Sequence, residues 1–435
     1  MPDIGLYPPV TMRIPYEVLS EIFLIFLEDL QRPSPCSVSN CIHRTITPTT
    51  TPLLRVGAVS VAWRRVAWTT PRLWTSVSFA IKDESTKTHA TLLQLVKEWI
   101  HRAGRVLPLS INAICYTNSE TSLEPFLNLL KEHRHRWQKL DFECDHPSIL
   151  ERLLRNNNNT CPSHLNQFRC ITTHPSQAEE HAGDVVLDLT ADSPREIHSS
   201  VPLSCIQTRW QFLRRLCITA RLPIDHLMRV LYDAPALTRC TVCLDFIEDI
   251  YGEVPPLVHN QLESLDLGFI PYPEDDGSEQ TVILEELLSR LSLPSLTTLC
   301  ITFDEDLNVN FDAAYADMLV SFLSQSRCLL KTFEQCGVIF LDEEAEDQLL
   351  AVLMNIASLE RLRITTDYRD LSTSFTDHFL GCLSVQHGNP DLLPNLKYFT
   401  YNGPLGFSEE VLAQISYDGT AILSNSLHGN TQRPR

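Results

Sequence analysis

The chain has 435 residues, of which 43% are hydrophobic and 20% charged, so it carries enough apolar side chains to bury a core. This length suggests two or three domains, unless a repeat array grows along one axis. Residues 1–110 hold 12 Lys and Arg against 8 Asp and Glu, so the remainder of this chain of net charge −19 holds 23 against 46. Such an acidic body argues against nucleic-acid binding and favours either simple solubility or a basic protein partner.

The first predicted helix follows Pro15, a residue that suits the first helical turn, and has Glu17 near its start. Its apolar residues recur at helical spacing and predict a wide apolar face: Val18, Leu19, Ile22, Phe23 and Phe26. We expect it to end near Glu28 and Asp29. Residues 31–52 hold four prolines among many Ser and Thr and predict a long flexible loop.

Helical spacing returns between Leu54 and Val66, where Gly57 is expected to divide the pattern into two short helices. Thr70-Pro71 stops it, because the residue before a proline disfavours helix. Alternating apolar and polar residues then predict strands over 73–79 and 108–114, on either side of a helix over 85–104.

A phrase of three bulky residues, spaced bulky-x-x-bulky-x-bulky, recurs through the rest of the chain. Its first residues are Trp137, Leu165, Leu213, Leu237, Leu262, Leu296, Leu330, Leu359 and Leu396, and the phrase at Leu330 has only its first two bulky residues, Leu330 and Phe333. Its last two bulky positions lie on the same side of a strand, which is the strand half of a leucine-rich repeat, and helical stretches fill the gaps between phrases. The pattern predicts an irregular leucine-rich repeat α/β solenoid with a curved parallel sheet and outer helices.

The steps between successive phrases are uneven, and the longest, 48 residues, separates Leu165 from Leu213. We attribute it to a polar insert over 172–202, and we place a second, acidic insert over 271–278. A final capping helix is expected from Ser408, followed by a disordered tail. The expected organisation is a tail over 1–11, a helical module over 12–80, the array over 81–407 and a C-terminal segment over 408–435.

The sequence offers only weak candidates for a metal site or for catalytic residues. Cys240 and Cys243 fit buried thiols better than a metal site, because positions i and i+3 of a strand face opposite ways. The set Cys161, His164, Cys170 and His174 lacks a standard zinc spacing. The basic run over 133–136 suits a helix C-terminus, and the acidic run over 343–347 suits a helix start. We expect no metal, no cofactor and no catalytic residue.

Three phrases in the N-terminal segment resemble those of F-box domains. Residues 14–23, Ile-Pro-Tyr-Glu-Val-Leu-Ser-Glu-Ile-Phe, are similar to the opening phrase, with Ile14 in place of the usual Leu. Residues 59–67, Val-Ser-Val-Ala-Trp-Arg-Arg-Val-Ala, look like the second half. Residues 70–77, Thr-Pro-Arg-Leu-Trp-Thr-Ser-Val, resemble the exit phrase typical of F-box proteins from mushroom-forming fungi. The loop over 31–52 is longer than in a compact F-box.

The resemblance implies a non-catalytic substrate receptor of an SCF-type cullin-RING ubiquitin ligase. In that family a three-helix module docks on the Skp-family linker, which bridges to the cullin, and a repeat array holds the substrate. Carried over by position, the docking residues would be Ile14, Pro15, Leu19, Ile22, Phe23, Leu54, Val59 and Trp63. For Phe23 and Trp63, packing inside the module is an equal alternative.

The alternative function is an interaction scaffold with a degenerate F-box. Neither a secretory signal nor a membrane span is recognisable in the sequence, so we expect a cytoplasmic or nuclear protein with no membrane partner.

Overall fold

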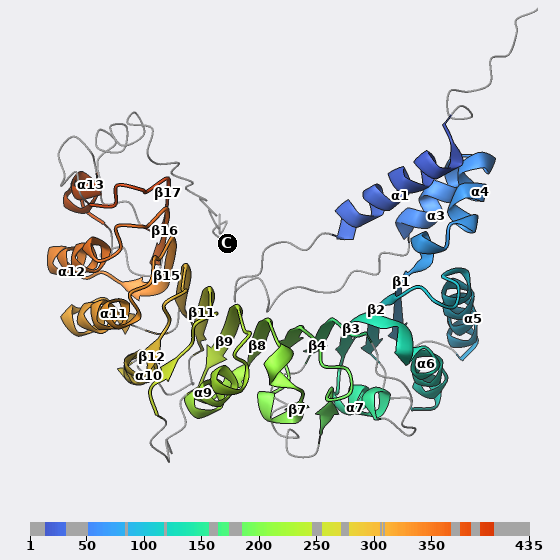
Figure 1. Ribbon diagram of the computed structural model, residues 1–435, viewed down its shortest axis with the longest axis horizontal. Helices are drawn as coiled ribbons and strands as arrows, with labels where there is room; N and C mark the ends of the chain where they lie inside the picture. The colour runs from blue at the N-terminus through green and yellow to red at the C-terminus, as the bar shows by residue number, and fades with distance from the viewer. Residues whose placement is uncertain are drawn as a thin grey trace, which may run out of the picture. The chain divides into compact units, whose positions relative to one another are not determined.

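The computed structural model describes residues 14–31, 51–82, 86–116, 120–155, 164–173, 185–245, 255–270, 278–304, 307, 309–366, 375–383 and 392–403. The chain divides into two compact units, Met1–Arg209 and Trp210–Arg435 (Figure 1). The predictions for the tail over 1–11, most of the proline-rich loop, most of the acidic insert and the C-terminal helix fall outside the described residues.

The first unit begins with helices and continues as a strand–helix array. Its helices are α1 (Tyr16–Gln31), α3 (Thr51–Val59), α4 (Val61–Thr69), α5 (Thr86–Arg102), α6 (Glu120–Glu132) and α7 (Ser148–Leu154), with short 3₁₀ turns η2 (Pro71–Trp74), η3 (Arg134–Arg136) and η5 (Leu203–Cys205). Its strands are β1 (Ser76–Lys82), β2 (Leu109–Tyr116), β3 (Trp137–Cys144), β4 (Gln167–Thr172), β5 (Leu187–Asp188), β6 (Glu196–Ser199) and β7 (Ile206–Gln207). The parallel order β1-β2-β3-β4-β6 follows the chain, while β5 pairs with β7.

The second unit repeats this arrangement. Its strands are β8 (Arg215–Leu222), β9 (Arg239–Leu244), β10 (Leu257–Val258), β11 (Ser264–Phe269), β12 (Leu291–Ser292), β13 (Thr298–Phe303), β14 (Val309–Asn310), β15 (Thr332–Ile339), β16 (Arg361–Thr366) and β17 (Tyr398–Asn402). Its helices are α9 (Ile224–Asp233), α10 (Ser278–Arg290), α11 (Ala313–Ser326), α12 (Glu343–Met354) and α13 (Asp377–Leu383), after the turn η6 (Trp210–Phe212). The strands pair in parallel in the order β8-β9-β11-β13-β15-β16-β17, and the helices lie along one face of them (Figure 1).

The later positions of all nine phrases lie on strands, as predicted, while most first positions directly precede the strand, and the phrases stack in register. In the second unit the middle position of the phrase runs through Leu216, Cys240, Leu265, Leu299, Phe333, Leu362 and Phe399, which are register partners from strand to strand. All seven side chains are buried. A parallel sheet of successive strand–helix repeats, consistent with a leucine-rich-repeat-like solenoid, therefore confirms the α/β fold class.

The polar insert predicted over 172–202 is wrong in part, because it contains the ladder strand β6. Ile197 is the register partner of Phe168 and is buried, while Ser199 takes the position where other strands carry a bulky residue. Its hydroxyl is satisfied locally, since it accepts a hydrogen bond from the backbone N–H of Val201 at 2.9 Å. The long step between Leu165 and Leu213 thus hides one repeat whose phrase is degenerate.

Two predicted helix boundaries near the N-terminus also differ from those in the structure. Helix α1 continues past Glu28 and Asp29 to Gln31. The break between the next two helices falls at Ser60 rather than at Gly57, because the Ser60 side chain caps α4 by accepting a hydrogen bond from Trp63 N at 3.1 Å. Gly57 instead lies inside α3, where a Cβ would come within 2.3 Å of the Trp68 ring.

Candidate docking surface on the N-terminal helices

Helix α1 packs against both α3 and α4, and one aromatic contact fixes that packing. The rings of Phe23 on α1 and Trp63 on α4 lie 5.0 Å apart between centroids, tilted by 56°. Phe23 is only 2% exposed. The side-chain oxygen of Tyr16 at the start of α1 is also 3.0 Å from that of Thr70, at the end of α4. These contacts give α1 a defined rotation about its own axis, and so decide which of its faces meets water.

The face of α1 that meets water is apolar. Leu19, Phe23 and Leu24 are buried, whereas the opposite stripe is between 46 and 59% exposed and consists of Val18, Ile22, Ile25 and Phe26. Positions i, i+4, i+7 and i+8 lie on one side of a helix, so these four side chains form a continuous row, which we call the α1 stripe. A helix that is apolar on two faces has a second surface to bury.

Helices α3 and α4 expose further large apolar residues. Leu54, Val59 and Val61 are exposed, whereas Leu53, Val56 and Val66 of the same helices form the interior. Together with the four residues of the α1 stripe, these three exceed the scattered single residues of an ordinary surface. Because these side chains are already partly buried, complete coverage by a partner would contribute on the order of 1–2 kcal/mol for each.

The residues assigned by resemblance divide between this surface and the interior. Pro15, Ile22, Leu54 and Val59 are exposed, Ile14 and Trp63 are half-buried, and Leu19 and Phe23 are buried. Leu19 and Phe23 therefore belong to the interior beneath the α1 stripe and not to the surface. Val18, Ile25, Phe26 and Val61 were not among the assigned residues; a helical wheel that separated two apolar faces of α1 would have found three of them.

Charged groups border the α1 stripe. Glu21 lies between the stripe and η2, and its carboxylate forms an ion pair with Arg72 Nη1 at 2.7 Å. Arg64 donates from Nε to the carbonyl of Gly57 at 3.0 Å, which ties α4 to α3. An apolar centre bordered by charged and polar groups is the usual composition of a protein–protein interface.

Three tryptophans connect these helices to the first helix of the array. Trp74 packs edge-on against Trp68 at 5.5 Å and against Trp99 of α5 at 4.7 Å. The Arg102 guanidinium lies over the rings of both Trp68 and Trp74, at 5.2 and 4.7 Å. Trp74 also donates from Nε1 to the Ala67 carbonyl at 2.8 Å. Within the first unit, α4 and α5 therefore share one aromatic cluster.

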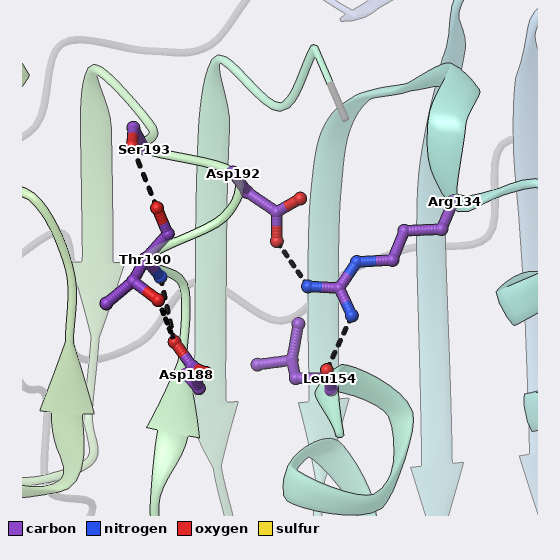
Figure 2. Close-up of polar contacts among 6 residues, drawn as sticks. All are labelled: Arg134, Leu154, Asp188, Thr190, Asp192 and Ser193. Atoms are coloured by element: carbon purple, nitrogen blue, oxygen red, sulfur yellow. Dashed lines mark hydrogen bonds and ion pairs between the residues drawn. The ribbon is translucent and has the colours of Figure 1, made fainter. Parts of the chain in front are cut away.

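The basic run over 133–136 has a role that the sequence did not reveal. Helix α6 ends at Glu132, and Arg134 extends from η3 to the Asp192 carboxylate at 2.6 Å and to the Leu154 carbonyl at 2.5 Å (Figure 2). Asp192 has no exposed side-chain surface and belongs to a turn in which Asp188 also accepts from the Thr190 hydroxyl, at 2.6 Å. The run lies just after the end of α6, as predicted, and Arg134 in addition forms a buried ion pair that joins three consecutive connections of the array.

The cysteines and histidines considered above as metal ligands show no sign of a metal site in the described residues. Cys240 and Cys243 are both buried, and burial raises the pKa of Cys240 to about 12, so its thiol stays protonated. Cys161 and His174 lie outside the described residues. Within the described ranges, no three His, Cys, Asp or Glu side chains are grouped as a metal site would require, and no helix is long and apolar enough to cross a bilayer.

The acidic run starts α12, as predicted, but one of its members is not solvated. Glu346 is buried, and its two carboxylate oxygens accept hydrogen bonds from Thr376 N at 2.6 Å and from the Thr376 hydroxyl at 2.8 Å. This carboxylate therefore holds the residue that precedes α13.

Comparison with known proteins assigns this chain to no family. No family model and no curated protein matches the chain. Among solved structures, a Bacteroides fragilis protein determined in a structural genomics programme is similar over 80% of this chain and 85% of its own, with a TM-score of 0.36 and 13% identity.

Proposed function

We propose that this chain is the substrate-receptor subunit of an SCF-type cullin-RING ubiquitin ligase. In this proposal the N-terminal helices form an F-box that docks on a Skp-family linker, and the repeat array holds a protein substrate. The chain itself makes and breaks no bonds, since ubiquitin transfer belongs to the conjugating enzyme that the cullin recruits.

The observation that carries the proposal is the α1 stripe. Val18, Ile22, Ile25 and Phe26 lie in water on a helix whose opposite face is already packed. The same helix contains the sequence phrase that resembles the F-box opening. An amphipathic helix whose apolar row fits a partner's groove is a recurring mode of protein recognition, and a linker with such a groove would bury this row.

A scaffold with a degenerate F-box would share the array but not the docking. The two functions differ in one property, the binding of the linker, because a scaffold needs no contact with it. The α1 stripe favours the receptor, since a degenerate module has no reason to keep four large apolar side chains exposed.

Co-expression with a Skp-family linker tests this choice. We expect the two proteins to elute together in size-exclusion chromatography, and replacement of Ile22 and Phe26 by Glu to abolish the complex while the thermal unfolding temperature stays near that of the wild type. Leu95→Glu is the matched control, since Leu95 is 61% exposed on α5 and away from the stripe. Separate elution of the wild-type proteins, or a complex that survives both Glu replacements, would refute the receptor function.

A further inference from the structure

Several strands of the second unit have one face in the core and one face partly open to water, whereas β11 is buried on both faces after Ser264. In β8 the residues alternate, so that Leu216, Ile218, Ala220 and Leu222 are buried while the residues between them are partly or fully exposed. The same alternation holds in β16 and β17. Because the helices lie along the other face (Figure 1), the exposed set forms the open face of the sheet.

Charge is separated between these two layers of the second unit. In its helices, ten acidic residues with described side chains stand against two arginines: Asp225, Asp233, Glu285, Glu286, Asp317, Glu343, Glu344, Glu346, Asp347 and Asp377 against Arg229 and Arg290. In its strands, five arginines stand against two acids: Arg215, Arg221, Arg239, Arg361 and Arg363 against Asp266 and Glu334. Among the helices and strands of the second unit, acidic residues therefore predominate in the helices and arginines in the strands.

The first group of arginines lies at the start of the second unit's sheet. Arg215 on β8 and Arg239 on β9 are register partners, so they stand side by side on the same face, and both are exposed. Arg221 follows on the same face of β8, opposite Cys243. Two exposed guanidinium groups side by side concentrate positive charge at this edge of the sheet.

The second group lies four strands further along. Arg361 is exposed and its guanidinium rests on the Tyr398 ring, 5.1 Å from the centroid. Arg363, two residues on, approaches Glu334 only at 3.6 Å, and its Nε has no hydrogen-bond acceptor among the described residues. Lys331 and Lys397 flank Glu360 on either side, at 3.9 and 2.7 Å.

The local potential there is positive. The hydrogen bond and charge of Lys397, with smaller contributions from Lys331 and Arg361, lower the pKa of the exposed Glu360 below its ordinary range. Four cations, Lys331, Lys397, Arg361 and Arg363, thus lie near two carboxylates, Glu360 and Glu334, which leaves net positive charge at this end of the face.

We propose that the open face of the second unit binds an acidic polypeptide segment, with the groups around Arg215 and Arg361 each engaging carboxylates. Arginine suits this role because its planar guanidinium donates two parallel hydrogen bonds to a carboxylate. Hydroxyls of Ser264, Thr298 and Thr332 lie between the two groups, on register partners of Arg239 and Arg361, and supply further hydrogen bonds. The expectation of a basic partner followed from the net charge of the chain alone and did not consider how charge is placed on this face.

The strand order sets the spacing of the ligand's charges. Arg239 and Arg361 are separated by four steps in the order β9-β11-β13-β15-β16. At about 4.8 Å per step this is roughly 19 Å. An extended peptide laid across the strands covers that distance with about six residues, so two acidic pairs about six residues apart match the two groups.

Fluorescence polarisation with purified full-length protein tests this proposal. The probe is a labelled peptide with two Glu pairs about six residues apart in a Ser and Gly background. We expect it to bind, to weaken as salt rises, and to lose about tenfold in affinity in Arg215→Gln/Arg239→Gln and again in Arg361→Gln/Arg363→Gln. Arg229→Gln/Arg290→Gln removes the same charge from the helical layer and should change the affinity less than about twofold.

Several results would overturn the proposal: no binding of the Glu peptide, equal losses in the helical control, preference for a matched Lys peptide or a single-stranded oligonucleotide, or binding only when phosphoserine replaces Glu. The assay contains no linker, so it does not depend on ligase assembly. Only the identification of the acidic segment as a ligase substrate rests on the proposed function.

Discussion

Tyr315 on α11 donates a hydrogen bond from its hydroxyl to Oε1 of Gln335 on β15, at 2.9 Å, across the core of the second unit. Gln335 stands where neighbouring strands carry Ile301 and Ile364, its register partners, and is completely buried. Its amide nitrogen donates to the Ile301 carbonyl at 3.4 Å. A polar residue thus occupies a core position of the repeat because one helix supplies its partner.

Removing one member of this pair should cost more than removing both. We expect Tyr315→Phe to lower the free energy of unfolding by about 1–3 kcal/mol, because the buried Gln335 oxygen loses its donor. The double variant with Gln335→Leu should recover most of that loss, since two apolar groups then replace the pair. Chemical denaturation of the two single variants and the double variant measures the coupling, and strictly additive losses would contradict this role.

The ion pair of Arg134 and Asp192 should be essential for the first unit. Arg134→Met leaves a carboxylate without exposed surface beside an apolar side chain, and we expect a loss of about 3 kcal/mol. The control is Arg155→Met, because Arg155 pairs with Glu151 at 3.0 Å on an exposed helix surface and should contribute less than about 0.5 kcal/mol. Similar midpoints for the two variants in urea would show that the buried pair does not stabilise the array.

Gly337 should not tolerate a side chain. It has a φ of +75° at an irregularity of β15, and a Cβ there would come within 2.1 Å of the Phe303 carbonyl oxygen. We expect Gly337→Ala to destabilise the protein by about 2 kcal/mol or more. Gly381→Ala in α13 is the control, because its Cβ would meet nothing within 4 Å and Ala favours helix. Differential scanning calorimetry should therefore show a lower transition only for Gly337→Ala.

His378 should give a small dependence of stability on pH. Its Nε2 lies 2.9 Å from Asp347 Oδ1, and the hydrogen bond to Asp347 raises the pKa of the imidazole above its ordinary value of 6.5. A raised folded pKa contributes stability that is fully present below the unfolded pKa and is lost as the pH rises through the folded pKa. The wild type should thus exceed His378→Gln by about 0.5 kcal/mol at most, and only at acidic pH, because the pair is exposed. A larger difference at alkaline than at acidic pH would contradict the assignment.

The periodic parts of the fold were predictable from the sequence and the exceptions were not. The nine phrases located their strands because bulky residues at fixed spacing record burial directly. Strand β6 was missed because Ile197 is the one large apolar side chain that its phrase retains, with Ser199 in the other inward position. Two interactions could not be predicted for another reason, because each joins residues far apart in sequence. They are the hydrogen bond between Tyr315 and Gln335 and the ion pair between Arg134 and Asp192.

For the candidate docking surface, the sequence identified the segment that contains it but not which side chains are exposed. Composition showed that α1 is apolar, but Val18 and Leu19 are adjacent in sequence and only the packing of Phe23 on Trp63 decides which of them meets water. The sign of charge on the open face was hidden as well, since net charge does not separate helices from strands.

Calorimetric titration of a Skp-family linker into this protein tests the central claim most directly. We expect saturable binding with a negative heat-capacity change, since apolar surface is buried, and loss of the binding heat in Ile22→Glu/Phe26→Glu but not in Leu95→Glu. Absence of a binding heat for the wild type at several temperatures, or equal binding by the stripe variant, would contradict it.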